Sequence, residues 1–97
     1  MQLSFPNGEH RDVNFHTGEV TIGARPDMMV SLPQSDLHPH HASILSDRRG
    51  VWLRVLPNAQ GIHLNGRPVK QLALLRSGDL LCFDQVRIQL RDTYAKS

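Results

Sequence analysis

The chain has 97 residues, of which 39% are hydrophobic and 21% charged, and its formal net charge is +2. This length allows one domain with a core of modest stability, and the weak positive charge, spread without a dense basic block, gives little support for nucleic-acid binding. No apolar run approaches the roughly 20 residues that a membrane-spanning helix needs, and no apolar signal region follows Met1. We therefore expect a cytoplasmic protein that does not insert into membranes.

Short extended segments separated by turn residues make up the chain. Alternating apolar and β-branched residues predict strands, in chain order, at residues 3–5, 13–15, 19–22, 29–32, 41–45, 51–56, 62–64, 80–83 and 86–91. Turn residues recur between them at about the 8 to 12 residue spacing that is typical of a β-sandwich. These features predict an all-β fold, a two-sheet antiparallel β-sandwich, with a single domain over residues 1–91 and a flexible tail at 92–97.

Two Asn-Gly pairs mark tight turns. Asn65 and Gly66 follow the predicted strand at 62–64, and Asn-Gly readily accepts positive φ at both central positions of a type I′ hairpin turn. Asn7 and Gly8 lie between the first two predicted strands and indicate the same turn in an opening hairpin. Gly66 is therefore expected to meet a backbone requirement and not to bind a ligand.

Trp52 and Cys82 are residue types that can bind ligands or react, but a structural role explains each of them. In the strand at 51–56 alternation places Trp52 on the face opposite Val51 and Leu53, where a packing role is favoured over a ligand platform. Cys82 is the single cysteine and is expected to be a buried hydrophobe, not a nucleophile. No Gly-rich phosphate loop and no nucleophile-base pair in a recognisable motif is present, so we expect no enzymatic activity and no cofactor.

Short motifs follow one another in a fixed order between residues 21 and 90. They are Ile22-Gly23, the loop Arg25-Pro26-Asp27, the block 37–44 with His41-Ala42, Gly61-x-x-Leu64-Asn65-Gly66, and Leu75-x-x-Gly78-Asp79-x-x-x-Phe83. This order resembles the forkhead-associated (FHA) domain, whose β-sandwich gathers its recognition loops at one end. The resemblance implies a protein-protein interaction module, an adaptor or scaffold in signalling or in a bacterial secretion-type assembly.

The same resemblance identifies the positions that hold a phosphate in FHA domains that bind phosphothreonine. Their Arg falls on Ala24, their Ser-Arg pair on His38 and Pro39, and their Ser-x-Asn-Gly-Thr turn on residues 58–62. An Arg-to-Ala change alone removes up to two charge-assisted hydrogen bonds of about 1.5 to 3 kcal/mol each, out of about 8 kcal/mol for a micromolar complex. We therefore predict a module that is phospho-independent or has altered phosphopeptide recognition.

The alternative is a phosphothreonine-peptide-binding domain that uses non-standard loop residues. The candidate partner-binding residues are Arg25, His38, His40, Asn58, Gln60 and His63. For Arg25 a solvated loop charge is the simpler interpretation, and for Asn58 and Gln60 turn geometry explains the residue type equally well. The partner is in either case a protein, either a partner domain or a phosphothreonine-containing peptide.

Three histidines close together in sequence raise the question of a metal site. In an extended segment His38 and His40 share a face while His41 points the other way, and no cysteine lies nearby. We therefore expect no metal site. The resemblance implies instead that a small set of residues forms the scaffold of the recognition loops: Gly23, His41, Gly61, Asn65 and Gly66.

Overall fold

The computed structural model describes residues 1–33, 36–57, 59, 61–83 and 85–91. The strands in this part of the chain are β1 (Gln2–Ser4), β2 (Val13–Asn14), β3 (Gly18–Gly23), β4 (Val30–Ser31), β5 (Ala42–Asp47), β6 (Gly50–Val55), β7 (Ile62–Leu64), β8 (Arg67–Pro68), β9 (Leu72–Leu75), β10 (Leu80–Phe83) and β11 (Val86–Arg91). Within these residues no helix is long and apolar enough to cross a membrane. The predicted tail at 92–97 lies outside the described residues.

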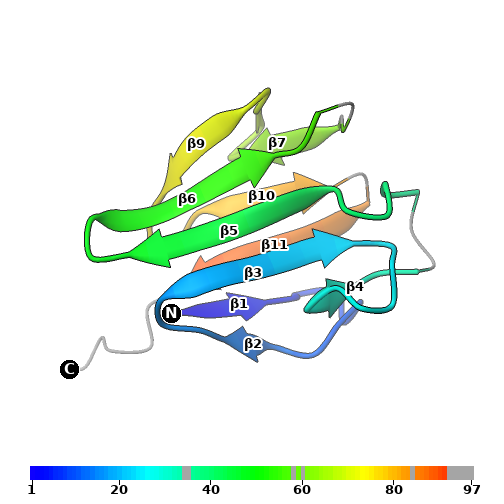
Figure 1. Ribbon diagram of the computed structural model, residues 1–97, viewed down its shortest axis with the longest axis horizontal. Coiled ribbons are helices and arrows are strands. Elements are labelled where there is room, and N and C mark those ends of the chain that lie inside the picture. The colour runs from blue at the N-terminus through cyan, green and yellow to red at the C-terminus, as the bar shows by residue number, and fades with distance from the viewer. Residues whose placement is uncertain (34–35, 58, 60, 84, 92–97) are drawn as a thin grey trace.

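The strands form two sheets that pack face to face (Figure 1). The six-stranded sheet has the order β2-β1-β11-β10-β7-β8, and the five-stranded sheet has the order β4-β3-β5-β6-β9. Paired strands are antiparallel except β3 and β4, which run parallel with Ile22 opposite Val30. The predicted two-sheet β-sandwich is thus confirmed, and the parallel pair is a local departure from the antiparallel pattern.

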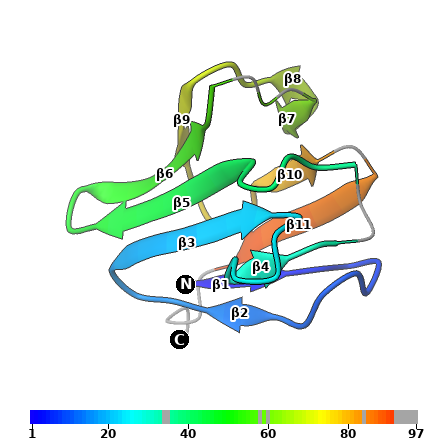
Figure 2. The same cartoon turned by 45° about the vertical axis from the view of Figure 1, so that its right-hand side comes forward.

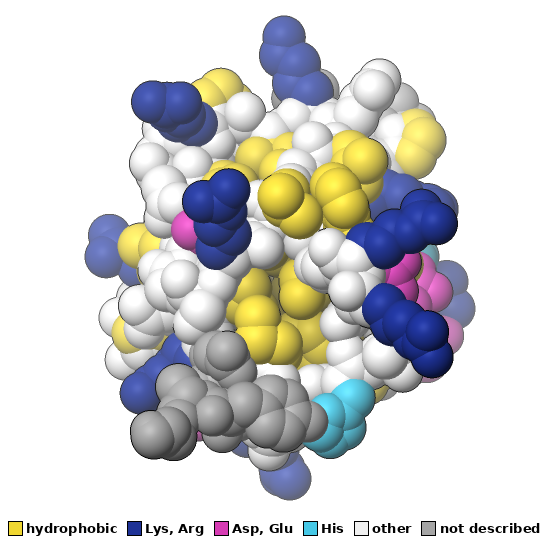
Figure 3. Space-filling view, turned by 90° about the vertical axis from the view of Figure 1, so that its left-hand side faces the viewer, with side chains coloured by type: hydrophobic (Ala, Val, Ile, Leu, Met, Phe, Trp, Pro, Cys, Tyr) yellow, Lys and Arg dark blue, Asp and Glu magenta, His cyan; other side chains and the backbone are white. Residues whose placement is uncertain are grey.

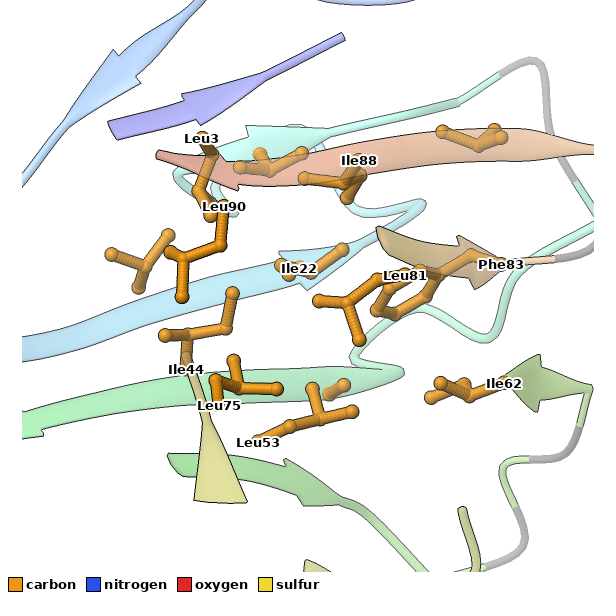
Figure 4. Close-up of a cluster of buried hydrophobic side chains, with 14 of the residues drawn as sticks. Leu3, Ile22, Ile44, Leu53, Ile62, Leu75, Leu81, Phe83, Ile88 and Leu90 are labelled. Atoms are coloured by element: carbon orange, nitrogen blue, oxygen red, sulfur yellow. The ribbon is translucent and has the colours of Figure 1, made fainter. Parts of the chain in front are cut away.

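Alternating side chains build the core between the sheets. In β6, Val51, Leu53 and Val55 are buried, whereas Trp52 is half-buried and Arg54 is exposed on the outer face, as the sequence predicts. The largest core side chains include Leu3, Ile22, Ile44, Leu53, Ile62, Leu81, Phe83, Ile88 and Leu90 (Figure 4). Because burying one such side chain contributes about 1.5 to 3 kcal/mol, apolar packing dominates the stability of this sandwich.

The two predicted Asn-Gly turns differ in the structure. Asn65 (φ 52°) and Gly66 (φ 85°) both have positive φ and join β7 to β8, which confirms the predicted hairpin. At the N-terminus β1 pairs with β2, but only Gly8 has positive φ, and its N–H donates to the carbonyl oxygen of Phe5 at 2.9 Å. The type I′ prediction is wrong there, because the connection spans residues 5–12 and turns more gradually.

Two strands and one side chain depart from the sequence expectations. The short β8 and the edge strand β9 were not predicted, since residues 72–75 read Leu-Ala-Leu-Leu, with neither β-branched residues nor apolar-polar alternation. Cys82 is only half-buried, because Leu81 and Phe83 take the interior positions of β10. It lies on the outer face of the six-stranded sheet, with His63 and Arg87 as cross-strand neighbours.

Candidate functional site

Three connections leave the same end of the sandwich, at the right of Figure 1 and again in Figure 2. They join β3 to β4, β4 to β5 and β6 to β7, and we call residues 24–29, 32–41 and 56–61 the recognition end. The strand register brings them together, because Ile22 near the end of β3 lies opposite Ala42, and Ala42 lies opposite Val55 at the end of β6.

Backbone hydrogen bonds hold the first two connections against each other. The N–H of Ala24 donates to the carbonyl oxygen of His38 at 3.0 Å, and the N–H of Arg25 donates to that of Pro39 at 3.1 Å. A Cβ on Gly23 would overlap the carbonyl oxygen of Pro39 and lie 2.9 Å from Cα of His40. Residue 23 must therefore lack a side chain for the two connections to approach this closely.

His41 lies beneath these connections with 2% of its surface exposed. Its Nδ1 accepts a hydrogen bond from the N–H of His38 at 3.1 Å, and its own N–H donates to the carbonyl oxygen of Ile22 at 2.8 Å. Its carbonyl oxygen accepts from the N–H of Leu56 at 3.2 Å, and its ring centroid lies 5.9 Å from that of Phe83. One residue thus links all three connections to the core.

The guanidinium of Arg25 is occupied within its own loop. Its Nε donates to Oδ1 of Asp27 at 3.0 Å, and its Nη2 contacts Oδ2 of the same carboxylate. Both side chains are more than half exposed, 54% for Arg25 and 58% for Asp27. This geometry is the two-point arrangement by which Arg binds a carboxylate or a phosphate, so the donors that could meet a phosphate are engaged by Asp27.

The two remaining histidines of the second connection point to different surroundings. His38 is exposed, and its ring centroid lies 5.5 Å from that of His41. His40 is half-buried, with Nε2 3.0 Å from Oγ of Ser43 on the outer face of the five-stranded sheet. The expectation that His38 and His40 share a face is wrong, because the chain bends at residues 39–40 and is not extended there.

The third connection contributes less to the described site. Gly61 is exposed, and Ile62 is 1% exposed in the core. His63 points outward from the six-stranded sheet beside Cys82 and Pro68, and no described contact joins it to the histidines of the recognition end. Asn58 and Gln60 lie outside the described residues, so their candidate roles stay predictions.

Asn65 and Gly66 form a turn at the far end of β7 from the recognition end. Asn65 Nδ2 donates to Oδ1 of Asp79 at 3.0 Å, and its Oδ1 accepts from the N–H of Leu80 at 2.9 Å. The other carboxylate oxygen of Asp79 accepts from the N–H of Arg76 at 2.8 Å. This network joins two turns of the sandwich at the ends of β7 and β10 that lie away from Ile62 and Phe83.

The recognition end is poor in positive charge. Its sequence contains one Arg or Lys, Arg25, against two carboxylates, Asp27 and Asp36. Asp27 is a site residue that was not predicted from the sequence, although the opposite charges of Arg25 and Asp27 on either side of Pro26 were a signal for their pairing. Among the residues that the structure describes, no three His, Cys, Asp or Glu side chains gather as metal ligands.

A family model described as FHA domain matches residues 20–84. A search of curated protein sequences found no match. Among solved structures, one from a structural and functional study of phosphothreonine-dependent FHA domain interactions is 26% identical, with a TM-score of 0.83 and coverage of 94% of both chains.

Two further solved structures resemble this chain. The FhaA FHA domain, crystallised in complex with the intracellular domain of Rv3910, is 26% identical with a TM-score of 0.80, and the match covers 91% of this chain and 96% of that one. The cytoplasmic domain of the T3SS sorting platform protein PscD from P. aeruginosa is 18% identical with a TM-score of 0.80, covering 98% and 82%. At that identity the likeness to PscD shows the fold alone.

Proposed function

Because this chain belongs to the FHA domain family, we propose that it is a protein-protein interaction module whose recognition end binds a partner without ordinary phosphothreonine recognition. The ion pair between Arg25 and Asp27 carries this proposal, since it engages the one Arg or Lys of the recognition end. A dianionic phosphate is held best by several charge-assisted donors. The recognition end instead presents more carboxylates than cations.

Two further positions support the loss of phosphate recognition. Ala24 carries a methyl group where the FHA resemblance implies an Arg, and its N–H is already bonded to the carbonyl oxygen of His38. Ile62, where the resemblance implies a Thr, is buried in the core and offers no hydroxyl to a peptide. Contacts with a partner then fall to exposed residues such as His38 and to the half-buried His40.

A folded partner domain is the kind of partner that we propose. The similar FhaA FHA domain has been crystallised with an intracellular domain of another protein, which supports this choice. We infer that residues 1–91 form the binding unit, acting in the cytoplasm as an adaptor or scaffold in signalling or in a secretion-type assembly, with no catalytic role. In this proposal Gly23 and His41 are scaffold residues that shape the surface without touching the partner.

The second candidate function is phosphothreonine-peptide binding through non-standard residues. It is favoured by the similarity to a structure from work on phosphothreonine-dependent FHA domain interactions. It requires Arg25 to leave Asp27 and to meet the phosphate together with His38, because no other cation is present in the recognition end. The two functions therefore make opposite predictions for Arg25.

A binding titration with matched peptides separates the two functions. A phosphothreonine peptide and its unphosphorylated form are titrated into the wild type, Arg25→Ala and the control Arg91→Ala, which removes an exposed Arg from the C-terminal end of β11. We expect no preference for the phosphorylated peptide in any of the three. A preference that Arg25→Ala abolishes and Arg91→Ala preserves would establish the second function instead.

The partner itself is sought by affinity capture before and after phosphatase treatment of a lysate. We expect capture to survive phosphatase and to weaken with His38→Ala, whose side chain is exposed at the recognition end. Loss of all captured proteins after phosphatase treatment would contradict a phospho-independent module. Arg91→Ala again serves as the control for a change on a distant surface.

A further inference from the structure

An apolar patch lies on the outer face of the five-stranded sheet, on β9 and the adjoining strands β6 and β5. Cross-strand pairing places Leu45 beside Trp52 and Trp52 beside Leu74 in one row. In the adjacent row Leu72 lies beside Arg54. Leu72 is 58% exposed and Leu74 45% exposed, which makes them two of the most exposed large apolar side chains among the described residues. Apolar side chains that gather in this way mark interaction surfaces.

The backbone of β9 is also open to a partner. β9 is the last strand of its sheet, and Figures 1 and 2 show no strand beyond it. The carbonyl oxygen of Gln71 accepts from the N–H of Val55 in β6 at 2.8 Å. Because alternate residues of an antiparallel strand face the same neighbour, Ala73 also bonds toward β6, whereas the N–H and C=O groups of Leu72 and Leu74 point to the free edge.

Positive charges flank this edge. Lys70 and Arg76 are exposed on either side of β9, and Arg54 is exposed beside Leu72. The nearby carboxylate of Asp79 already accepts hydrogen bonds from the N–H of Arg76 and from the side chain of Asn65. Figure 3, which views the end opposite the recognition end, shows hydrophobic side chains in the middle of that face with Lys, Arg, Asp and Glu side chains around them.

The charges of Lys70 and Arg76 indicate whether a second copy of this chain or a different protein pairs with the free edge of β9. In an antiparallel pairing of β9 with itself that sets Leu72 of one copy opposite Leu74 of the other, Lys70 of each copy, in the bend before β9, comes near Arg76 of its mate. Like charges directly opposite each other destabilise a strand pair, and charged residues at an edge are a known protection against such self-pairing. A partner with acidic residues at these two positions converts both repulsions into attractions.

We propose that β9 binds an extended segment of a partner protein, which adds as a sixth strand and carries two apolar residues, one residue apart, flanked by acidic residues. Main-chain hydrogen bonds to Leu72 and Leu74 supply the pairing, and the apolar side chains of the segment extend the row of Trp52 and Leu74. The acidic residues face Lys70 and Arg76. The proposed contacts use no residue of the recognition end, so this inference is tested independently of the function proposed above.

Amide hydrogen exchange in the complete chain, followed by NMR, tests the proposal directly. The probe is the peptide Glu-Thr-Val-Thr-Val-Thr-Glu, and the control peptide has Lys at both ends. We expect the acidic peptide to slow the exchange of the Leu72 and Leu74 amides and to leave Ala73 unchanged, since that amide already bonds to β6. Unchanged exchange at Leu72 and Leu74 up to millimolar peptide, or equal slowing by both peptides, would overturn the proposal.

Three variants separate the contributions of backbone hydrogen bonds and of charge to peptide binding at β9. Leu74→Pro removes one outward N–H and leaves the hydrogen bonds between β9 and β6 intact, because an edge strand tolerates proline at a position that faces away from its neighbour. We expect this variant to lose peptide binding and to keep the dispersed NMR spectrum of a folded protein. The double variant Lys70→Glu and Arg76→Glu is expected to bind the acidic peptide about fivefold more weakly, as for the loss of two exposed ion pairs. It is expected to bind the Lys-flanked peptide more tightly than the acidic one. If Leu74→Pro instead unfolds the chain, Leu74→Lys tests the same edge through its side chain, and unaltered binding by the folded variant counts against the proposal.

Sedimentation and a recognition-end variant complete the test. A dimer of the wild type that Leu74→Pro abolishes would show that a second copy occupies the edge, and the proposal of an acidic partner would fail. Arg25→Ala is expected to bind the acidic peptide like the wild type, whatever its effect at the recognition end. Loss of peptide binding in Arg25→Ala would contradict an independent site on β9.

Discussion

The carbonyl oxygen of Pro39 occupies the space that a side chain on Gly23 would need. This close approach allows the backbone bonds from Ala24 to His38 and from Arg25 to Pro39. The two connections therefore form one surface with a defined shape. Glycine at position 23 is a packing requirement that no flexible neighbour can relieve, since the blocking atoms belong to the backbone.

Gly23→Ala is therefore expected to destabilise the domain by about 3 kcal/mol, the upper part of the range for forced overpacking. Chemical denaturation gives the free energy of unfolding. Ser31→Ala, at the position opposite Gly23 in β4, is a control expected to change stability by less than about 1 kcal/mol. A Gly23→Ala variant as stable as this control would show that the connections can separate without loss.

His41 provides a second test of how the recognition end is held. His41→Ala removes the acceptor for the part-buried N–H of His38 and the buried ring that packs on Phe83, and the lost hydrogen bond together with the cavity is expected to cost about 2 to 4 kcal/mol. His38→Ala changes an exposed neighbour in the same loop and is expected to cost less than about 1 kcal/mol. Equal losses of unfolding free energy in the two variants would contradict a supporting role for His41.

Asn65 stabilises its turn in two ways, by accepting a positive φ and by its side-chain hydrogen bonds, and two substitutions separate these contributions. Asn65→Gly keeps the positive φ but loses the hydrogen bonds to Asp79 and Leu80, which is expected to cost about 1 to 2 kcal/mol. Asn65→Ala also strains the backbone and is expected to cost about 1 kcal/mol more. Thermal or chemical unfolding measures both. If Asn65→Ala is no less stable than Asn65→Gly, the positive φ at this turn is of no energetic importance.

The strands that were predicted correctly are those in which the alternation of apolar and polar residues matches the burial of alternate side chains in the sandwich. In β6 the alternation of Val51 and Leu53 with Trp52 follows directly from one buried and one open face. β9 was missed because an edge strand needs neither β-branched residues nor a polar outer face, and the composition Leu-Ala-Leu-Leu has a high intrinsic preference for helix. Its exposed leucines became informative only once the structure showed which strand they border.

The recognition end was predictable in position but not in detail. The spacing of Gly23 and His41 indicates the loops, yet the ion pair that engages Arg25 depends on how three residues turn, and the opposed directions of His38 and His40 depend on a bend. Such loop geometry is set by backbone contacts between segments far apart in the sequence, which periodicity does not report.

The pairing of Arg25 with Asp27 gives the most direct prediction about binding. Asp27→Asn removes the carboxylate charge that engages the guanidinium. Because an exposed ion pair is worth about 0.2 to 1 kcal/mol, its loss is expected to strengthen binding of a phosphothreonine peptide by up to about fivefold. Asp36→Asn removes the other exposed carboxylate of the recognition end without touching Arg25. Calorimetric titration of both variants should show the gain for Asp27→Asn alone. An equal gain in both would mean that overall charge, and not the release of Arg25, controls phosphate binding, and Asp27 would lose its assigned role as the group that blocks it.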